Sequence, residues 1–150
     1  MRQPPRFPLA VLPTPLVPAP RLGEALEREI WIKRDDLTGF ALGGNKVRTL
    51  EVLVADALDR GCDHMVGGGG PGSNLGPALA AAAGTAGLGC TIVLFGPEPC
   101  AVHPNLAMMR AFGARVVFTG DPDRAATSRY AEAEAVRLRA RGYRPYVVPR

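Results

Sequence analysis

The sequence predicts an open α/β fold in which helices cover both faces of a parallel sheet, giving a three-layer sandwich. From residue 63 onward, apolar segments typical of strands alternate with longer segments of helical periodicity. Some of these segments, such as 90–95 (CTIVLF), are apolar throughout, as in strands buried on both faces. Glycines follow the predicted helices, where they commonly end them. This alternation is typical of parallel strands joined by right-handed helical crossovers.

The first 44 residues differ from the rest and are predicted to form an N-terminal arm (1–44), separate from an α/β domain of residues 45–150. Seven prolines lie among the first twenty residues. Because proline fixes φ and removes a backbone donor, this part should be extended and irregular. A short helix is expected over 21–28, a half-buried strand over 30–34 and a turn over 35–39.

The α/β domain should begin with an amphipathic helix. Asn45 is a suitable N-cap residue and Gly61 a suitable end. Its apolar face is predicted to comprise Leu50, Leu53, Val54, Ala57 and Leu58. The predicted elements that follow are a strand at 63–66, a glycine loop at 67–72, a helix at 75–86, a strand at 90–95, a helix at 105–112, a strand at 115–119, a helix capped by Asp123 and ending near 141, and a strand at 146–148.

Composition excludes several classes of function. Hydrophobic residues make up 47% of the chain and charged residues 21%, a balance typical of folded, soluble proteins. The formal charge is +4, but the basic residues are dispersed and aromatic residues amount to only 6%, so no nucleic-acid partner is predicted. No apolar run is long enough to cross a bilayer, and we expect a cytoplasmic protein without membrane association.

The three cysteines, Cys62, Cys90 and Cys100, do not predict a disulfide framework or a metal site. Their number is odd and no CxxC spacing occurs. We expect buried or half-buried thiols in a reducing compartment, and no metal.

Lys46 is the first candidate for chemistry. It follows Gly43 and Gly44 and should lie in the first turn of a helix, where a cation is electrostatically unfavourable because that end of the helix is positive. A lysine amine in such a place suits Schiff-base chemistry. From these residues alone, a solvated surface lysine after a turn is the favoured interpretation.

The second candidate is the glycine-rich segment 67–72 with Ser73 and Asn74, placed between a strand and a helix. Such a loop exposes backbone N–H groups to a phosphate or carboxylate at the helix N-terminus. It matches neither the dinucleotide-binding fingerprint nor the P-loop. No clean GxGxxG opens the helix as the fingerprint requires, no acidic residue follows at the right place, and no GK[ST] follows. Ser73 and Asn74 could also act simply as N-caps.

Taken in this order, the motifs resemble those of the 1-aminocyclopropane-1-carboxylate deaminase and D-cysteine desulfhydrase family, within the fold-type II pyridoxal-phosphate (PLP) enzymes of the tryptophan synthase β-like superfamily. The similarity extends over nearly the whole chain. The segments that carry it are 12–16 (LPTPL), 32–39 (IKRDDLTG), 43–48 (GGNKVR) with Leu50 and Glu51, 72–74 (GSN) and 145–149 (PYVVP).

The resemblance implies a role for each matching residue. Lys46 would hold PLP as a Schiff base and move the α-proton of the substrate. Asn74 would donate a hydrogen bond to the phenolic oxygen of the cofactor, with Asn45 as a further cofactor contact. The segment from Gly72 through Ser73 and Asn74 to Leu75 would receive the substrate carboxylate. Ser73 is also implied to act in catalysis.

Two positions depart from the family pattern. Leu75 stands where the family usually has histidine, which removes a polar group near the cofactor. The glutamine that generally precedes the serine is also absent, since Gly72 occupies that position. The substrate preference of the family should therefore not be transferred to this chain.

Family members are about twice as long as this chain, and the resemblance implies that their C-terminal half binds the cofactor phosphate. The arm would pack on that half. We therefore expect a subunit of a split PLP-dependent enzyme, a lyase or deaminase acting on a small amino acid. A second polypeptide would supply the C-terminal half in a hetero-oligomer. The alternatives are a shortened form of a longer chain, a non-catalytic scaffold or regulatory partner that keeps the fold, and a generic anion-binding α/β module.

Overall fold

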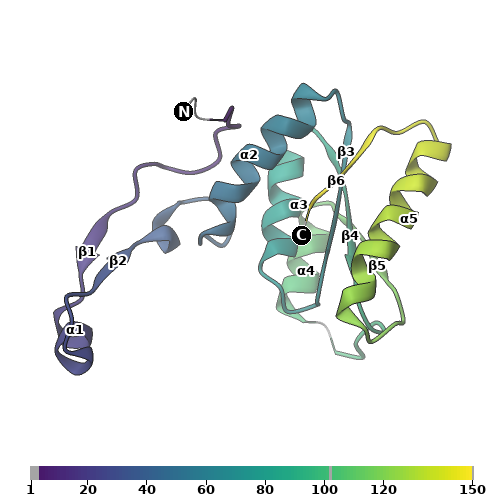
Figure 1. The fold of residues 1–150 in the computed structure, drawn as a ribbon. Coiled ribbons are helices and arrows are strands. Elements are labelled where there is room, and N and C mark those ends of the chain that lie inside the picture. Colours follow the sequence, from purple (N-terminus) through teal and green to yellow (C-terminus); the bar gives the residue numbers. More distant parts are fainter. Residues whose placement is uncertain (1–3, 102, 150) are drawn as a thin grey trace.

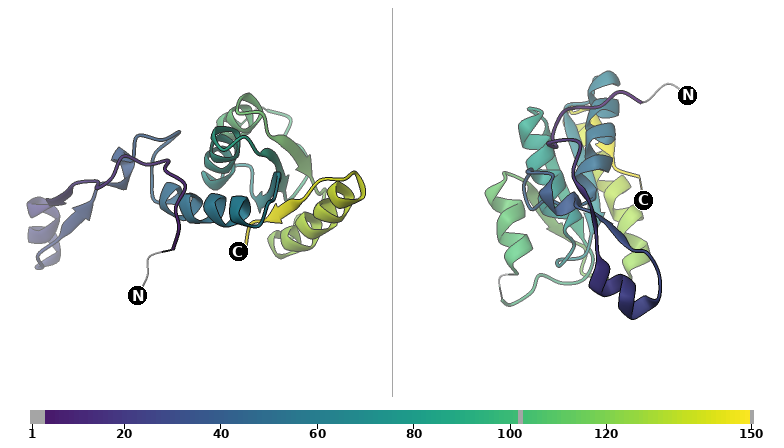
Figure 2. Two further views of the ribbon diagram at one scale, coloured as in Figure 1. Left: turned by 90° about the horizontal axis from the view of Figure 1, so that it is seen from above. Right: turned by 90° about the vertical axis from the view of Figure 1, so that its left-hand side faces the viewer.

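The computed structural model describes residues 4–101 and 103–149, and it confirms the predicted α/β architecture (Figure 1). A parallel sheet of four strands in the order β5-β4-β3-β6 forms the middle layer. Helices α2, α3 and α4 lie on one face and α5 on the other, which gives three layers (Figure 2). The bounds are β3 His64–Gly69, β4 Gly89–Leu94, β5 Arg115–Phe118, β6 Pro145–Val147, α2 Lys46–Asp59, α3 Leu75–Thr85, α4 Pro104–Ala111 and α5 Thr127–Ala140.

The chain reverses its direction across the sheet once. It moves outward from β3 to β4 and β5, and α5 then returns it to β6 on the other side of β3. With crossovers of one hand, this reversal places α5 on the face opposite α3 and α4. The strand β3 thus has β4 on one side and β6, which the chain reaches through α5, on the other, and the carboxyl ends of such strands are where ligands bind in open α/β sheets.

Each face of the sheet has its own apolar core. The larger core lies under α2, α3 and α4 and includes Leu50, Val54, Leu79, Ile92 and Met109, all essentially inaccessible to solvent. The smaller core lies under α5 and comprises Val66, Val93, Ala131, Ala135 and Leu138. Val66 of β3 and Val93 of β4 face this smaller core, whereas their neighbours in each strand face the larger one. Because both faces of the strands are apolar, the strand segments read as continuous apolar runs.

The inner strand β3 contains glycines for which the sequence predicts a loop. The prediction that the loop starts at Gly67 is wrong, because β3 extends to Gly69. A Cβ at Gly67 would lie 2.2 Å from Leu79 Cδ2, and one at Gly68 would lie 2.7 Å from Thr127 Cγ2. These glycines therefore let α3 and α5 approach β3 from opposite faces.

The N-terminal arm, described from residue 4 to residue 44, extends away from the sandwich (Figures 1 and 2). Its strands β1 and β2 pair antiparallel as a two-stranded sheet that is separate from the parallel one. The strand predicted over 30–34 is confirmed as β2, but the prediction that it is half-buried is wrong, since Trp31, Ile32 and Lys33 are all exposed. The apolar members of the alternation have no layer to cover them within the described residues. The bounds are β1 Leu16–Pro18, α1 Pro20–Leu26, β2 Trp31–Lys33 and the 3₁₀ turn η1 Asp35–Leu37.

Two polar clusters attach the arm to α2. The Glu51 carboxylate is 3% exposed and accepts hydrogen bonds from the backbone N–H groups of Leu9 and Ala10 at 3.1 and 2.9 Å. Arg48 donates to Asp35 at 2.7 and 2.9 Å, and its hydrogen bonds hold the pKa of Asp35 below the usual range. Buried charge acceptors of this kind fix the path of an otherwise irregular segment.

The cysteines and the helix starts differ in part from expectation. Cys90 is buried, which raises its pKa to about 12, and Cys62 is half-buried, but Cys100 is exposed, contrary to the prediction. Asp123 caps the 3₁₀ turn η2 (Arg124–Ala126) that precedes α5, by accepting from Ala125 N at 2.8 Å.

In the described part of the chain, no group of His, Cys, Asp and Glu could hold a metal, and no helix is long and apolar enough to span a membrane.

The Glu51→Ala substitution should release the base of the arm, because it removes the acceptor of two backbone N–H groups. We expect amide hydrogen exchange at Leu9 and Ala10 to accelerate by about tenfold or more, with little change in β3 and β4. Asp59→Ala, at an exposed site on the same helix, is the matched control. Unchanged exchange at both amides would contradict the assigned role of Glu51.

Candidate functional site

A cleft of about 780 Å³ opens at the carboxyl ends of β3 and β6. This volume lies within the range of small-molecule sites. The cleft occupies the place where the chain reverses across the sheet, so the topology and the cavity indicate the same site. The lining residues come from α2, from the end of β3 and the glycine segment that leads into α3, from the residues just after β4 and β6, and from η2: Lys46, Thr49, Leu53, Gly68–Ser73, Leu75, Phe95, Arg124, Val148 and Pro149.

Lys46 is the first residue of α2 and lines this cleft. The chain has two lysines, and the other, Lys33, donates its Nζ to the backbone oxygen of Thr14. Among the residues that the structure describes, the Nζ of Lys46 has no hydrogen-bond or ion-pair partner. An unpaired amine at a ligand cleft is available for chemistry.

Glycines, rather than a side-chain cap, shape the turn before Lys46. Asn45 occupies the N-cap position but its side chain makes no capping hydrogen bond, so its predicted role as a cap is wrong. Gly43 and Gly44 have φ of +68° and +88°, a region that L side chains rarely adopt, and their N–H groups bond to Phe40 O and Asp35 O. The helix start is therefore fixed by backbone bonds of the glycines.

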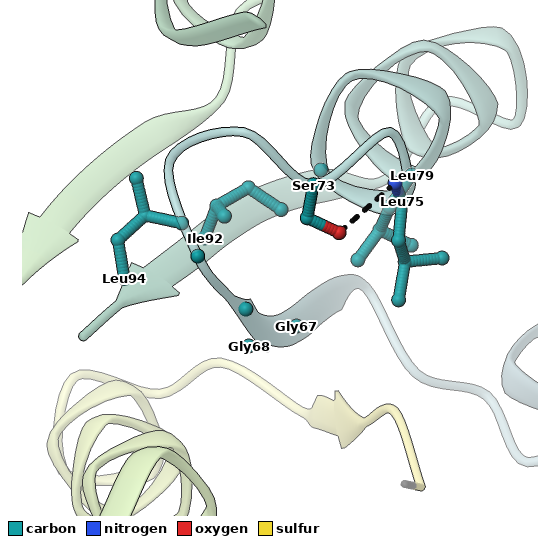
Figure 3. Close-up of a pocket in the computed structure, with 10 residues that line it drawn as sticks. Gly67, Gly68, Ser73, Leu75, Leu79, Ile92 and Leu94 are labelled. Carbon is teal, nitrogen blue, oxygen red and sulfur yellow. Dashed lines mark hydrogen bonds between the residues drawn. The ribbon is translucent and has the colours of Figure 1, made fainter. Parts of the chain in front are cut away.

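Ser73 shares the cleft with Lys46, at the start of α3. Its backbone N–H donates to Gly70 O at 3.0 Å, which closes the glycine turn, and its Oγ accepts from Leu75 N at 3.3 Å (Figure 3). The hydroxyl of Ser73 thus serves the helix start and still carries a proton that it can donate. The structure therefore brings Lys46, Gly72, Ser73 and Leu75 to one cleft.

Asn74 and Asn45 are placed differently. Neither is among the residues that line the cleft, and both are exposed, as Lys46 also is. Asn74 precedes α3 without a side-chain cap bond, and its Oδ1 accepts from Asn105 Nδ2 at 3.1 Å. This contact leaves the Nδ2 group of Asn74 free to donate. The predicted roles of both asparagines toward the cofactor stay predictions.

The charge of the cleft suits an anion. Lys46 and Arg124 line it, and no Asp or Glu is among the lining residues that the structure describes. Sequence reasoning missed Arg124, and also Phe95, whose ring would lie 2.8 Å from a Cβ at Gly70. No local pattern marks either residue, because each reaches the cleft only through the folding of a later segment.

Beneath the glycine segment the site is apolar. A small pocket there is lined by Ser73 and by aliphatic side chains (Figure 3). Leu75 belongs to this wall. The other aliphatic members are Leu79, Ile92 and Leu94.

The fold and the cleft define an α/β domain with a candidate small-molecule site at the reversal point of its sheet. The family profile described as "Pyridoxal-phosphate dependent enzyme" matches residues 8–150, and the chain belongs to this family. This finding confirms the resemblance noted from the motifs, and pyridoxal phosphate is the cofactor of the family.

Individual relatives agree with this assignment. The chain is 40% identical over 153 residues to the D-cysteine desulfhydrases of Salmonella paratyphi B and Salmonella newport, covering 97% of this chain and 45% of each relative. A crystal structure described as an ACC deaminase homologue superposes with a TM-score of 0.89 at 35% identity, covering 98% of this chain and 45% of that one. A PLP-dependent aspartate racemase gives a TM-score of 0.66 at 26% identity, covering 89% and 39%. The chain thus corresponds to the N-terminal half of such proteins and spans about half their length.

The residues present fit a bound PLP. The cleft offers the unpartnered amine of Lys46, a second cationic residue, Arg124, and a glycine segment without side chains. No carboxylate is among its described lining residues. A Cβ at Gly69 would lie 3.4 Å from Ser73 Cβ and one at Gly70 would contact the Phe95 ring, so side chains here would fill the space above the loop. Backbone donors beside a cationic amine are suited to an anionic aldehyde cofactor.

Substitutions at the two glycines before Lys46 should differ in cost. Gly43→Ala combines a strained φ with a Cβ 2.6 Å from Asp36 O, and we expect a loss of about 3 kcal/mol in the free energy of unfolding. Gly44→Ala has the strain but no atom within 4 Å, and should cost about 1 kcal/mol. Urea unfolding measures both, and equal losses would contradict the clash with the backbone of η1.

Proposed function

We propose that this chain is a subunit of a PLP-dependent enzyme that acts on a small amino acid by deamination, β-elimination or related chemistry, with Lys46 holding the cofactor as a Schiff base. The observation that carries the proposal is the unpartnered Lys46 amine in the same cleft as the Ser73 loop, at the reversal point of the sheet. The family membership and the D-cysteine desulfhydrase relatives support it.

When bound, PLP supplies an electron sink that acidifies the bond to the α-hydrogen of an amino acid. The Lys46 amine would anchor the cofactor and, once exchanged for the substrate amine, accept that hydrogen as a proton at Nζ. Asn74 would donate its free Nδ2–H group to the phenolic oxygen of the cofactor, and Asn45 would be a further cofactor contact. The start of α3 would bind the substrate carboxylate, because its N–H groups and the Ser73 hydroxyl are donors at the positive end of a helix.

The arm supports a partner that supplies the other half of the site. Large apolar side chains are exposed along it, and surfaces of this kind mark interfaces. We propose that a second polypeptide resembling the C-terminal half of the family covers this surface and completes the enzyme in the cytoplasm as a hetero-oligomer. The exposed apolar residues of the arm are Val11, Leu12, Leu16, Leu22, Leu26, Trp31, Ile32, Leu37 and Leu42.

A second candidate function is a non-catalytic scaffold or regulatory subunit that keeps the fold. The apolar wall formed by Leu75 favours it, since a polar group near the cofactor is missing there. The free amine of Lys46 and the hydroxyl of Ser73 favour the enzyme, because a scaffold needs neither.

Covalent trapping tests the role of Lys46. We expect PLP followed by borohydride to leave a phosphopyridoxyl group on Lys46 in preference to Lys33, because the Lys33 amine is hydrogen-bonded to Thr14 O. Peptide mass spectrometry locates the group. Lys46→Ala should remove most of the label, and Lys33→Arg should leave it unchanged. Equal labelling of both lysines, or persistence in Lys46→Ala, would sink the proposal.

The partner is tested through Trp31, the single tryptophan of the chain, which is 51% exposed on β2. Co-purification with a polypeptide resembling the C-terminal half should shift the Trp31 emission to shorter wavelength, because the indole leaves water. Ile32→Asp should weaken the complex, and Val136→Asp, at an exposed apolar site on α5, is the control. No shift in a stable complex would place the interface elsewhere.

A further inference from the structure

His103 lies immediately before α4 with a defined orientation. Its Nδ1 accepts a hydrogen bond from Asn105 N at 3.2 Å, which caps the helix. In the neutral ring the proton must then sit on Nε2, since Nδ1 is the acceptor. His103 therefore presents a fixed N–H donor, and protonation of Nδ1 would break the cap.

That donor faces the proposed carboxylate loop. A Cβ at Gly72 would lie 3.5 Å from His103 Nε2 and 3.8 Å from Cε1, so the imidazole sits over the glycine with no side chain between them. The hydrogen bond from Asn105 to Asn74 ties the start of α4 to the start of α3. Among the residues that the structure describes, Nε2 has no partner of its own.

Several other free donors lie along the same loop. The N–H groups of Ser73 and Leu75 are bonded to Gly70 O and Ser73 Oγ, whereas the described residues provide no partner for those of Gly72 and Asn74. The hydroxyl proton of Ser73 is also free. Such a set of donors without a neighbouring acceptor is suited to a carboxylate.

The second histidine of the chain plays no part in this site. His64 lies at the amino end of β3, at the opposite edge of the sheet, and its Nε2 contacts Thr91 Oγ1 at 2.9 Å. Burial lowers its pKa. His103 is therefore the histidine that lies beside Gly72 of this segment, although it is not among the residues that line the cleft itself.

We propose that His103 is a further substrate-binding residue, whose Nε2–H donates to the carboxylate held by the Gly72–Asn74 segment. The inference rests on the proposed function and extends it by adding a side-chain donor that lies immediately before α4. Sequence separation hides this role, since Gly72 and His103 are 31 positions apart and only the packing of α4 on α3 joins them.

Two substitutions separate binding from helix capping. Asparagine at this position, His103→Asn, keeps an acceptor for Asn105 N but is too short to reach Gly72. Glutamine, His103→Gln, reaches with an amide donor but is a poorer cap. The full-length chain, labelled with ¹⁵N, is titrated at neutral pH with sodium acetate against sodium chloride of equal ionic strength.

We expect acetate to cause a saturable shift of the amide signals of Gly72 and Asn74 and of the His103 ring in the unsubstituted chain. The affinity should fall by about fivefold or more in His103→Asn and stay within about twofold in His103→Gln, as expected for loss of one hydrogen bond. Equal affinity in His103→Asn, or no saturable shift in the unsubstituted chain, overturns the proposal. Borohydride trapping at Lys46 in the same variants reports separately on the proposed function, because that reaction needs no substrate carboxylate.

Discussion

The contact of two helices with a strand that lacks side chains is the constraint on which the rest of the domain depends. At Gly67 the strand β3 meets Leu79 of α3, and at Gly68 it meets Thr127 of α5, in both cases closer than any Cβ would allow. Because β3 is the central strand, this close packing sets the spacing of all three layers. It also sets the position of the segment from Gly69 onward, which leaves the sheet between the starts of these helices.

The position of the cleft follows from that packing and from the reversal of the chain. The connection through α5 brings β6 beside β3, so that Val148 and Pro149 face the glycine segment across the carboxyl edge. Helix α2 packs on α3 and begins at the same edge, which brings Lys46 to the opening. Two residues far apart in the sequence, Lys46 and Arg124, thus make an anion-attracting cleft without any local motif that joins them.

The sequence carried enough local information to predict the layers, the strand–helix alternation, and the two segments that contain Lys46 and Ser73. It failed where tertiary contacts override local preference. Local preference places Gly67 in a loop, but its close packing against Leu79 belongs to β3. Local preference also makes Asn45 a cap, but backbone hydrogen bonds of Gly43 and Gly44 fix the helix start instead. The alternation at 30–34 has the pattern of a half-buried strand, yet its apolar side is exposed. No local rule distinguishes a face covered within the chain from one that is left uncovered.

The arm and the cleft support a partner for independent reasons. On the arm, the apolar side of β2 is exposed although Glu51 and Arg48 hold its base firmly against α2, so its exposure is not that of a loose terminus. At the cleft, the described residues supply cations and hydrogen-bond donors but no carboxylate. PLP enzymes commonly place an acidic or basic group against the ring nitrogen of the cofactor. The proposed partner would account for both features, the exposed apolar surface of the arm and the missing acceptor groups of the cleft.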